Sequence, residues 1–415
     1  MQYLYIVFLM TVVTQNMIFG GYCVSQNEEG KKILVKGALP DETVEVKVVA
    51  TKKDYDEAVV VKVIKGSAYR TEPKCAYYGT CGGCNLQYVQ DEYQTELRKS
   101  ILKNALERNG IKISDDKIEC VSGSKWNYRS RFVLHNGGLM ENESNSVVYV
   151  DECAIATKNV NSVLQNADLM KKAKSFDKLH IFEDKTSEKY CEQALLDQKQ
   201  NKKIIGNKKK NVKSGGKRNI YEGTNFSSTL QSLAQVEVCG NTMNFDVRGF
   251  FQSNLEMLEK TGKILKDNFY GENLLDIYSG GGTLSLILKD NFKNFTLVEH
   301  NRDAITCAEI NLSGISHESY GLSGSKWVEL YKSQKNPKVF DALVIDPPRS
   351  GMEKEVLSWI CTSEIPRIRS MSCDPVTHSR DLAHLIQSGY NLQKLYLLDF
   401  YPQTSHIESL AILEK

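Results

Sequence analysis

The stretch NLLDIYSGGGTLSLILKDN, residues 273–291, decides the fold of this chain. An apolar strand over 273–279 leads into a glycine loop, and a helix is predicted directly after the loop. Glycines let the backbone approach a ligand closely, and the start of a helix supplies free N–H groups and the positive end of a dipole. The next strand ends in an acid, Glu299, where an acid commonly binds both hydroxyls of a ribose. This order favours a nucleoside cofactor over a plain tight turn.

The alternation of strand and helix continues on both sides of this stretch. An amphipathic helix over 255–269 precedes it. Further strands are predicted over 295–301, 340–348, 364–373, 392–400 and 406–415. Helices between successive strands are typical of a parallel sheet covered on both faces. We therefore predict a multidomain α/β chain whose C-terminal domain, residues 249–415, is a doubly wound, Rossmann-like domain.

Asp346 and the two prolines after it end the strand predicted over 340–348. They lie at the edge of the sheet where such folds bind their cofactor. Adjacent prolines stiffen the backbone carbonyls, which suits the binding of a flat base. A purely structural role as a strand terminator is the alternative. The motif favours S-adenosylmethionine over NAD as the cofactor.

Cys373 lies at the end of an apolar strand in RSMSCDPVTH, residues 369–378. Taken alone, this stretch favours a buried structural cysteine over a reactive one. In a doubly wound sheet, however, Cys373 is one strand away from Asp346, and Glu408 starts the last strand. A thiol and a carboxylate base beside a methyl donor suit methylation of uracil C5. The thiolate adds at C6, C5 then attacks the methyl group, and the base removes the C5 proton.

Residues 1–66 are predicted to be all-β. Short β-branched runs such as KKILVKG and TVEVKVV are separated by turn residues, which suits a small OB-like barrel. Six lysines are expected on its outside, either merely solvated or in contact with RNA: Lys31, Lys32, Lys47, Lys52, Lys53 and Lys62. The apolar residues 1–10 resemble the core of a signal peptide but lack a basic leader. We expect a first strand with an upstream extension instead.

Clustered cysteines mark residues 67–248, where a central α+β domain is expected. Cys75, Cys81 and Cys84 follow a C-x5-C-x2-C pattern, and Cys153 is the candidate for a distant fourth ligand. The C-x2-C pair suits zinc, whereas four thiolates with one far off also suit an iron–sulfur cluster. This clustering indicates a metal site in a reducing compartment rather than a disulfide framework.

The totals limit what the chain can be. Its 415 residues exceed one ordinary domain, so two or three are expected. A net charge of +2 gives no global reason to bind nucleic acid, so any basic surface must be local. The insert 199–218 has nine basic residues and no acid. It is interpreted either as a solvated loop or as a contact to phosphates.

Seven motifs occur in the order typical of the RNA uracil-C5 methyltransferases. They are WNYRSR, GFFQSN, DIYSGGG, LVEHN, VIDPPRSGM, SCDPVTHSRDL and HIESLAIL. Over nearly its whole length the chain resembles this family, in particular the branch with a TRAM domain and a [4Fe–4S] cluster that modifies 23S ribosomal RNA. Residues 31–49 look like TRAM, and the cysteine pattern looks like the ligands of the cluster.

The resemblance implies a role for each matching residue. Cys373 matches the nucleophile that attacks uracil C6, and Glu408 matches the general base that takes the C5 proton. Four residues match contacts to S-adenosylmethionine: Gln252, Tyr278, Glu299 and Asp346. The cluster ligands implied are Cys75, Cys81, Cys84 and Cys153. Arg129 and Arg131 match positions that touch RNA.

Three positions depart from the family pattern. Asp374 stands where the family usually has asparagine after the nucleophile. An ionised carboxylate there raises the pKa of the thiol, or its side chain points away and caps the turn as the amide would. Thr283 is a changed cofactor contact, and Ser279 replaces a common cysteine with little expected consequence.

By this resemblance the chain is an enzyme that forms 5-methyluridine in RNA. The expected substrate is 23S ribosomal RNA, and we expect a cytoplasmic monomer without stable membrane association. A transfer-RNA T-loop methyltransferase is the alternative within the class. A non-catalytic RNA-binding protein and a dinucleotide-dependent oxidoreductase with a redox cluster are the alternatives outside it. The intact set of catalytic and cofactor residues argues against the former, and the latter has no use for Glu408.

Overall fold

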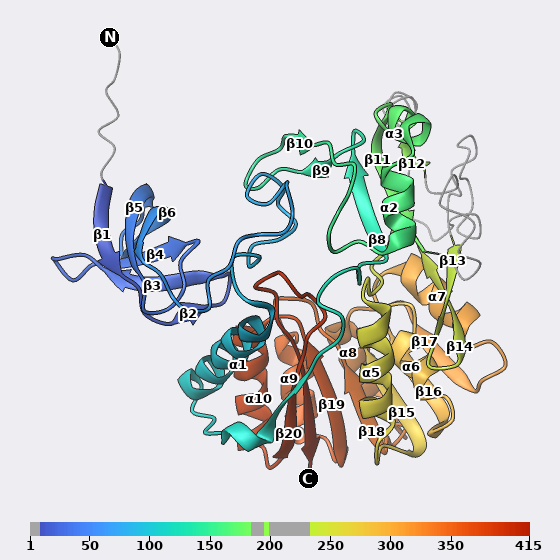
Figure 1. Ribbon diagram of the computed structural model, residues 1–415. Helices are drawn as coiled ribbons and strands as arrows, with labels where there is room; N and C mark the ends of the chain where they lie inside the picture. The colour runs from blue at the N-terminus through green and yellow to red at the C-terminus, as the bar shows by residue number, and fades with distance from the viewer. Residues whose placement is uncertain (1–8, 184–194, 199–232) are drawn as a thin grey trace, which may run out of the picture.

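The computed structural model describes residues 9–183, 195–198 and 233–415 (Figure 1). Two predictions therefore concern residues outside the described ranges, namely those for residues 1–8 of the apolar N-terminal stretch and for the basic insert 199–218. Residues 9 and 10 begin a strand, as expected for the end of that stretch.

Residues 9–65 form one sheet of six strands in the order β1-β5-β6-β4-β3-β2. The strands are β1 (Leu9–Val13), β2 (Met17–Ile18), β3 (Tyr22–Gln26), β4 (Lys32–Lys36), β5 (Thr43–Thr51) and β6 (Tyr55–Lys65). Just beyond β1, Gln15 donates its backbone N–H to the carbonyl of Val24 in β3 at 2.7 Å, so the sheet curls back on itself. Alternate residues such as Ile33 and Val44 are fully buried within it. The all-β prediction for this segment is confirmed.

The lysines of this sheet are mostly on its outside. Five are exposed: Lys32, Lys47, Lys52, Lys53 and Lys62. Lys31 is half-buried, and its Nζ lies 2.6 Å from Oδ1 of Asp56. The outer surface is thus basic in part, while one of the six lysines stabilises the sheet.

The middle of the chain contains several small elements. Helix α1 (Asp91–Arg108), a short 3-10 turn (Asp115–Lys117) and β7 (Ile118–Val121) come first. A three-stranded sheet follows, made of β8 (Arg131–His135), β11 (Phe176–Phe182) and β12 (Leu195–Gln198), with helices α2 (Lys158–Leu164) and α3 (Ala167–Ala173) beside it. Two strand pairs complete this part: β9 (Leu139–Met140) with β10 (Val147–Val148), and β13 (Leu233–Val238) with β14 (Asn241–Asp246).

The C-terminal part is built on an eight-stranded sheet with the order β17-β16-β15-β18-β19-β21-β20-β7. Its strands besides β7 are β15 (Gly271–Ile277), β16 (Phe292–Val298), β17 (His317–Tyr320), β18 (Ala342–Ile345), β19 (Arg367–Ser372), β20 (Asn391–Leu398) and β21 (Glu408–Glu414). Strands β15 to β19 run parallel, whereas β21 is antiparallel to both of its neighbours. The predicted doubly wound α/β sheet is confirmed.

Helices cover both faces of this sheet (Figure 1). They are α5 (Leu255–Lys266), α6 (Thr283–Ile287), α7 (Arg302–Asn311), α8 (Gly324–Ser333), α9 (Lys354–Thr362) and α10 (Pro375–Gln387). Successive strand residues point to opposite faces, so Leu275 packs with α1, α8, α9 and α10, whereas Leu274 packs with α5, α6 and α7. Because both faces are covered, the strands read as continuous apolar runs.

Two predicted boundaries differ from the structure. Strand β7 pairs in parallel with β20, and α1 packs against α10, so both belong with the C-terminal sheet rather than with the rest of residues 67–248. A four-residue strand has too little periodicity to reveal a partner so distant in sequence. Helix α6 ends at Ile287, well before residue 291, so its dipole is smaller than that of the predicted helix.

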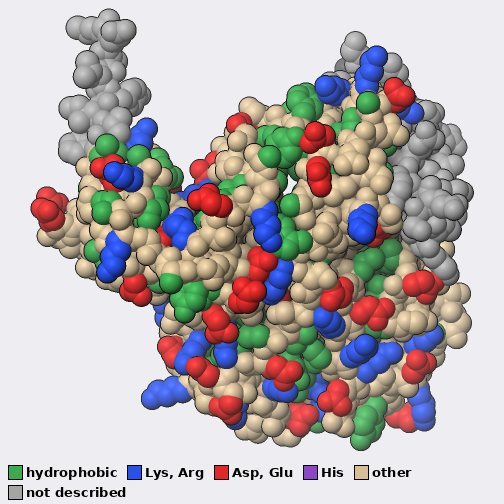
Figure 2. Space-filling model, viewed as in Figure 1, with side chains coloured by type: hydrophobic (Ala, Val, Ile, Leu, Met, Phe, Trp, Pro, Cys, Tyr) green, Lys and Arg blue, Asp and Glu red, His purple; other side chains and the backbone are tan. Residues whose placement is uncertain are grey.

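The surface of the C-terminal part has charges of both signs. Figure 2 shows Lys and Arg side chains interspersed with Asp and Glu on the face in view. This mixture agrees with the net charge of +2 for the whole chain.

Candidate active site

The carboxyl ends of four adjacent parallel strands meet at one edge of the C-terminal sheet. The first residue after each strand is one that the sequence singled out: Tyr278 after β15, Glu299 after β16, Asp346 after β18 and Cys373 after β19. With Gln252 and Glu408, they line a single pocket of about 1340 Å³. The rule that parallel strands end at the same edge of the sheet accounts for four of these six residues, whereas Gln252 precedes α5 and Glu408 begins the antiparallel β21.

The glycine loop has the backbone shape that its sequence requires. Tyr278, Gly280 and Gly282 have positive φ angles of 64°, 54° and 72°. A β-carbon at Gly282 would lie 3.0 Å from that of Ala308, so a larger residue would need a shift in the helix behind it. Glu299 holds the loop in place, because its Oε2 accepts the backbone N–H of Gly280 at 3.1 Å.

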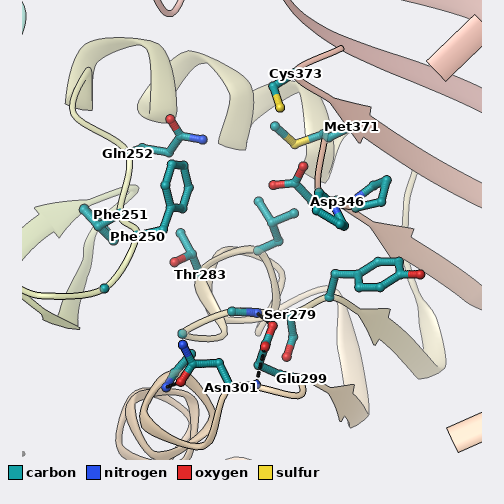
Figure 3. Close-up of a pocket in the computed structure, with 18 of the residues that line it drawn as sticks. Phe250, Phe251, Gln252, Ser279, Thr283, Glu299, Asn301, Asp346, Met371 and Cys373 are labelled. Carbon is teal, nitrogen blue, oxygen red and sulfur yellow. Dashed lines mark hydrogen bonds between the residues drawn. The ribbon is translucent and has the colours of Figure 1, made fainter. Parts of the chain in front are cut away.

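This loop fits a nucleoside ligand. The hydroxyl of Ser279 is buried in the pocket wall and lacks a hydrogen-bond partner within the described residues. A β-carbon at Gly280 would meet no atom within 4 Å, so the backbone there borders open space. Ser279, Glu299 and Asn301 lie at one end of the cavity, whereas Gln252, Asp346 and Cys373 point into the other end (Figure 3).

Two buried carboxyl groups near the glycine loop have raised pKa values. Burial raises the pKa of Asp346, in the pocket wall, to about 6 and that of Asp276, outside the pocket lining, to about 7. The hydroxyl of Ser285 donates to Oδ2 of Asp276 at 2.6 Å and opposes the latter shift.

Cys373 is half-buried at the end of β19, with its side chain in the cavity (Figure 3). Burial raises the pKa of its thiol to about 11, and the neighbouring Glu408 and Asp346 add to the increase. Arg349 lowers this pKa. In the free protein the thiol is therefore protonated at neutral pH, and a nearby base or cation must help it to react.

Asp374 caps helix α10. Its Oδ1 accepts the backbone N–H groups of Val376 and Thr377, both at 2.9 Å. Of the two interpretations of this departure from the family pattern, the structure agrees with the capping one. The causes that raise the thiol pKa are burial, Glu408 and Asp346.

Glu408 is the first residue of β21 and is 2% exposed. Burial raises the pKa of its carboxyl well above the usual range; Asp346 adds to this and Arg349 opposes it. Among the described residues, its Oε1 has no hydrogen-bond partner. A buried, unpaired carboxyl oxygen in a pocket wall is a candidate for proton transfer to or from a ligand.

The segment before α5 closes the pocket from the other side. Gln252 is buried, and its Oε1 accepts the hydroxyl of Tyr401 at 3.3 Å. Arg129 lines the pocket. Arg131 instead donates to the backbone carbonyls of Val247 and Gly249, both at 2.9 Å. It therefore holds the segment that presents Gln252.

The four candidate metal ligands are half-buried free thiols, namely Cys75, Cys81, Cys84 and Cys153. Burial raises the pKa of Cys84 to about 12, and the electrostatic influence of Cys153, Cys75 and Cys81 adds to it. Over residues 9–183, 195–198 and 233–415, no group of three or more His, Cys, Asp or Glu is arranged to hold a metal ion. The described residues thus provide thiol donors but no assembled metal site.

Sequence reasoning missed Arg349 as a functional residue. It lines the pocket directly after the two prolines and acts on the pKa of both Cys373 and Glu408. Its position one residue beyond DPP, at the cofactor edge, was the available signal.

In the described part of the chain, no helix is both long and apolar enough to cross a membrane.

Comparisons with known proteins match this chain to RNA methyltransferases. A family model described as tRNA (Uracil-5-)-methyltransferase matches residues 327–415. A Treponema denticola protein named "Uncharacterized RNA methyltransferase" is 35% identical over 97% of this chain and 98% of its own length. The 23S rRNA (uracil(1939)-C(5))-methyltransferase RlmD of Shewanella amazonensis is 28% identical over 93% of this chain and 91% of its own.

A solved structure has the same fold. That of the Pyrococcus abyssi tRNA (uracil-54, C5)-methyltransferase with S-adenosyl-L-homocysteine matches with a TM-score of 0.67. It covers 97% of this chain and 100% of its own at 22% identity. This likeness shows that the two proteins share a fold. Because it matches the Treponema denticola protein over nearly the whole length of both, the chain belongs to the family of RNA methyltransferases, and its residues 327–415 match the uracil-5-methyltransferase model.

Proposed function

We propose that this enzyme methylates C5 of a uridine in 23S ribosomal RNA through a covalent adduct with Cys373, and that Glu408 is the base. The observation that carries the proposal is the presence of this thiol and this unpaired carboxyl in one pocket with the glycine loop. Uracil C5 is a poor nucleophile on its own, and a thiol with a separate base answers that problem.

Cys373 and Glu408 each have one role in the proposed reaction. The thiol of Cys373 gives up its proton to solvent, its sulfur bonds to C6, the C5–C6 double bond opens, and the electrons of that bond pass to C5 and the O4 enolate. S-adenosylmethionine, when bound, would supply the methyl group that C5 accepts, and its sulfur would keep the electrons of the broken S–CH3 bond and leave as S-adenosylhomocysteine. Glu408 then takes the C5 proton, the double bond re-forms, and the thiolate leaves.

The residues that would hold S-adenosylmethionine are Gln252, Tyr278, Glu299 and Asp346. Support comes from their common pocket and the open glycine backbone. Glu299 is the candidate for binding the ribose hydroxyls because it directly follows β16, the next strand after the glycine loop.

Ribosomal RNA is proposed as the substrate from the likeness to RlmD and from the N-terminal sheet with its exposed lysines, which we interpret as a TRAM-like RNA-binding module. Transfer RNA is the second candidate, favoured by the family model and by the Pyrococcus structure. Methyl incorporation into 23S and transfer-RNA transcripts by the purified protein distinguishes the two. The proposed site of action is the cytoplasm, where such RNA lies.

We also propose that Cys75, Cys81, Cys84 and Cys153 hold a [4Fe–4S] cluster with a structural role. The support is their spacing, their free thiols and their mutual electrostatic influence. Zinc is the alternative for the same donors. Metal analysis of protein purified without air tests this: about four irons per chain and a brown colour are expected, whereas one zinc and no colour would contradict the cluster.

A further inference from the structure

A buried histidine lies beneath the site and takes no part in the chemistry proposed above. His378, in the first turn of α10, is 2% exposed. Its Nδ1 lies 2.7 Å from the hydroxyl of Ser409, and its Nε2 lies 3.2 Å from the hydroxyl of Ser370. The side chain thus joins β21 and β19, which are neighbours in the sheet.

The ring of His378 is the centre of a chain of hydrogen bonds. The hydroxyl of Ser409 also lies 3.3 Å from the carbonyl of Ser372, and a carbonyl can only accept. With its proton on Nδ1, the ring donates to Ser409; with its proton on Nε2, the ring donates toward the backbone of Ser370 and accepts from Ser409. Either tautomer ties the ring to the hydroxyl of Ser409. Burial lowers the pKa of His378 to about 4, and the hydrogen bond to the backbone of Ser370 opposes this shift, so the ring is neutral.

The two ends of this chain adjoin the two proposed catalytic groups. The carbonyl of Ser372 belongs to the peptide bond that leads to Cys373, and Ser409 follows Glu408 directly. Ser372 and Ser409 are register partners in the antiparallel pair β19–β21. A change in the hydrogen bonding of Ser409 thus acts on the backbone next to both groups.

We propose that His378 is a positioning residue, which sets the spacing between Cys373 and Glu408 by holding Ser409 and the Ser372 carbonyl in one hydrogen-bonded chain. This inference rests on the proposed function. An apolar side chain of similar size would fill the same space but leave the hydroxyl of Ser409 without the ring nitrogen as its partner. Misplacement of reacting groups by about 1 Å is enough to cost about a hundredfold in rate.

The test uses His378→Leu with His384→Leu as its matched control. His384 is exposed on the same helix, and its Nδ1 lies 2.9 Å from the carbonyl of Arg380, one turn earlier. The probe is RNA containing 5-fluorouridine, with S-adenosylmethionine present. Fluorine replaces the proton that a base must remove, so the adduct accumulates and is counted on a denaturing gel.

We expect His378→Leu to slow adduct formation tenfold or more, while its dissociation constant for S-adenosylmethionine stays within twofold and His384→Leu matches the wild type. Ser409→Ala should slow it similarly, and the double variant should be no slower than the slower single variant, because both interrupt one chain. Adduct formation at the wild-type rate, or losses that multiply in the double variant, would overturn the proposal.

Two further outcomes are distinct. If His378→Leu weakens binding of S-adenosylmethionine as much as it slows the adduct, this substitution disturbs the fold in general, and Ser370→Ala, which removes one hydroxyl and no ring, decides instead. Positioning predicts that Ser370→Ala slows adduct formation about threefold with unchanged cofactor binding, and an unchanged rate of adduct formation would overturn the proposal. If the wild type itself forms no adduct, the proposed function fails first, and the role of His378 fails with it.

Discussion

Ser372 and Ser409 lie opposite one another in the antiparallel pair β19–β21, and the hydroxyl of Ser409 reaches the carbonyl of Ser372 at 3.3 Å. Cys373 directly follows Ser372 at the end of β19, and Glu408 directly precedes Ser409 in β21. Because antiparallel partners stay in register, this pair brings the thiol and the carboxyl to the same edge of the sheet. The antiparallel strand β21, inserted between β19 and β20, is therefore what gives the pocket its second reactive group.

Replacing Cys373 by alanine should abolish methyl transfer and leave binding of S-adenosylmethionine within about twofold. The reason is that the thiol alone activates C5, whereas the glycine loop and Glu299 remain intact. Radiolabelled methyl transfer to RNA and calorimetric binding of the cofactor measure the two effects. Cys361→Ser, a free cysteine in α9, is the control and should be fully active. Turnover by Cys373→Ala would refute the covalent mechanism.

Glu408→Gln should lower turnover by about 10² to 10⁴ and trap the RNA on the protein. The amide fills the same space but does not take the C5 proton, so the adduct with ordinary uridine persists and appears as a slow band on a denaturing gel. Glu414→Gln, at the far end of β21, serves as the control. If Glu408→Gln turns over without accumulating adduct, another group is the base.

The rate of adduct formation should rise with pH between about 6 and 9. The thiol of Cys373 has a pKa raised to about 11, so its thiolate fraction increases about tenfold per pH unit in this range. The carboxyl of Glu408 also has a raised pKa, so it loses its proton and becomes a base as the pH rises. Arg349→Gln removes a cation that lowers both pKa values and should shift the profile to higher pH. A flat profile, or a shift to lower pH in this variant, would contradict these assignments.

Asp374→Asn should preserve activity within about threefold, because asparagine caps a helix as well as aspartate does. Asp374→Ala removes both capping hydrogen bonds and should lower the free energy of unfolding by about 1 kcal/mol. Urea denaturation and the methyl-transfer assay measure the two quantities. A large gain in activity for Asp374→Asn would mean that the carboxylate suppresses the thiol after all.

A buried ion pair should stabilise the junction between α1 and the loop before Glu408. Arg98 and Asp399 are each 1% exposed and lie 2.8 Å apart. Arg98→Met leaves Asp399 with Lys125 alone and should lower the free energy of unfolding by about 3 kcal/mol. Lys103→Met breaks the exposed pair with Asp115 and should produce no measurable change. Equal effects of the two substitutions would show that burial does not set the contribution of this pair.

The sequence was sufficient to predict the pocket because its chemistry lies at strand ends. Four of its residues each follow an apolar run: Tyr278, Glu299, Asp346 and Cys373. Because parallel strands end at the same edge of the sheet, these residues come together there. Strand β7 was missed because four residues have no readable period and their partner β20 is far along the chain. The contacts of His378 were beyond sequence reasoning as well, since they depend on which hydroxyl lies next to which ring nitrogen.

The most direct test of the central claim is nucleoside mass spectrometry of separated ribosomal and transfer RNA from cells with and without this gene. We predict that 5-methyluridine is lost from 23S ribosomal RNA, remains in transfer RNA, and returns with the wild-type gene but not with Cys373→Ala. Loss from transfer RNA instead would keep the chemistry and change the substrate. Unchanged 5-methyluridine in both RNAs would contradict the proposed function.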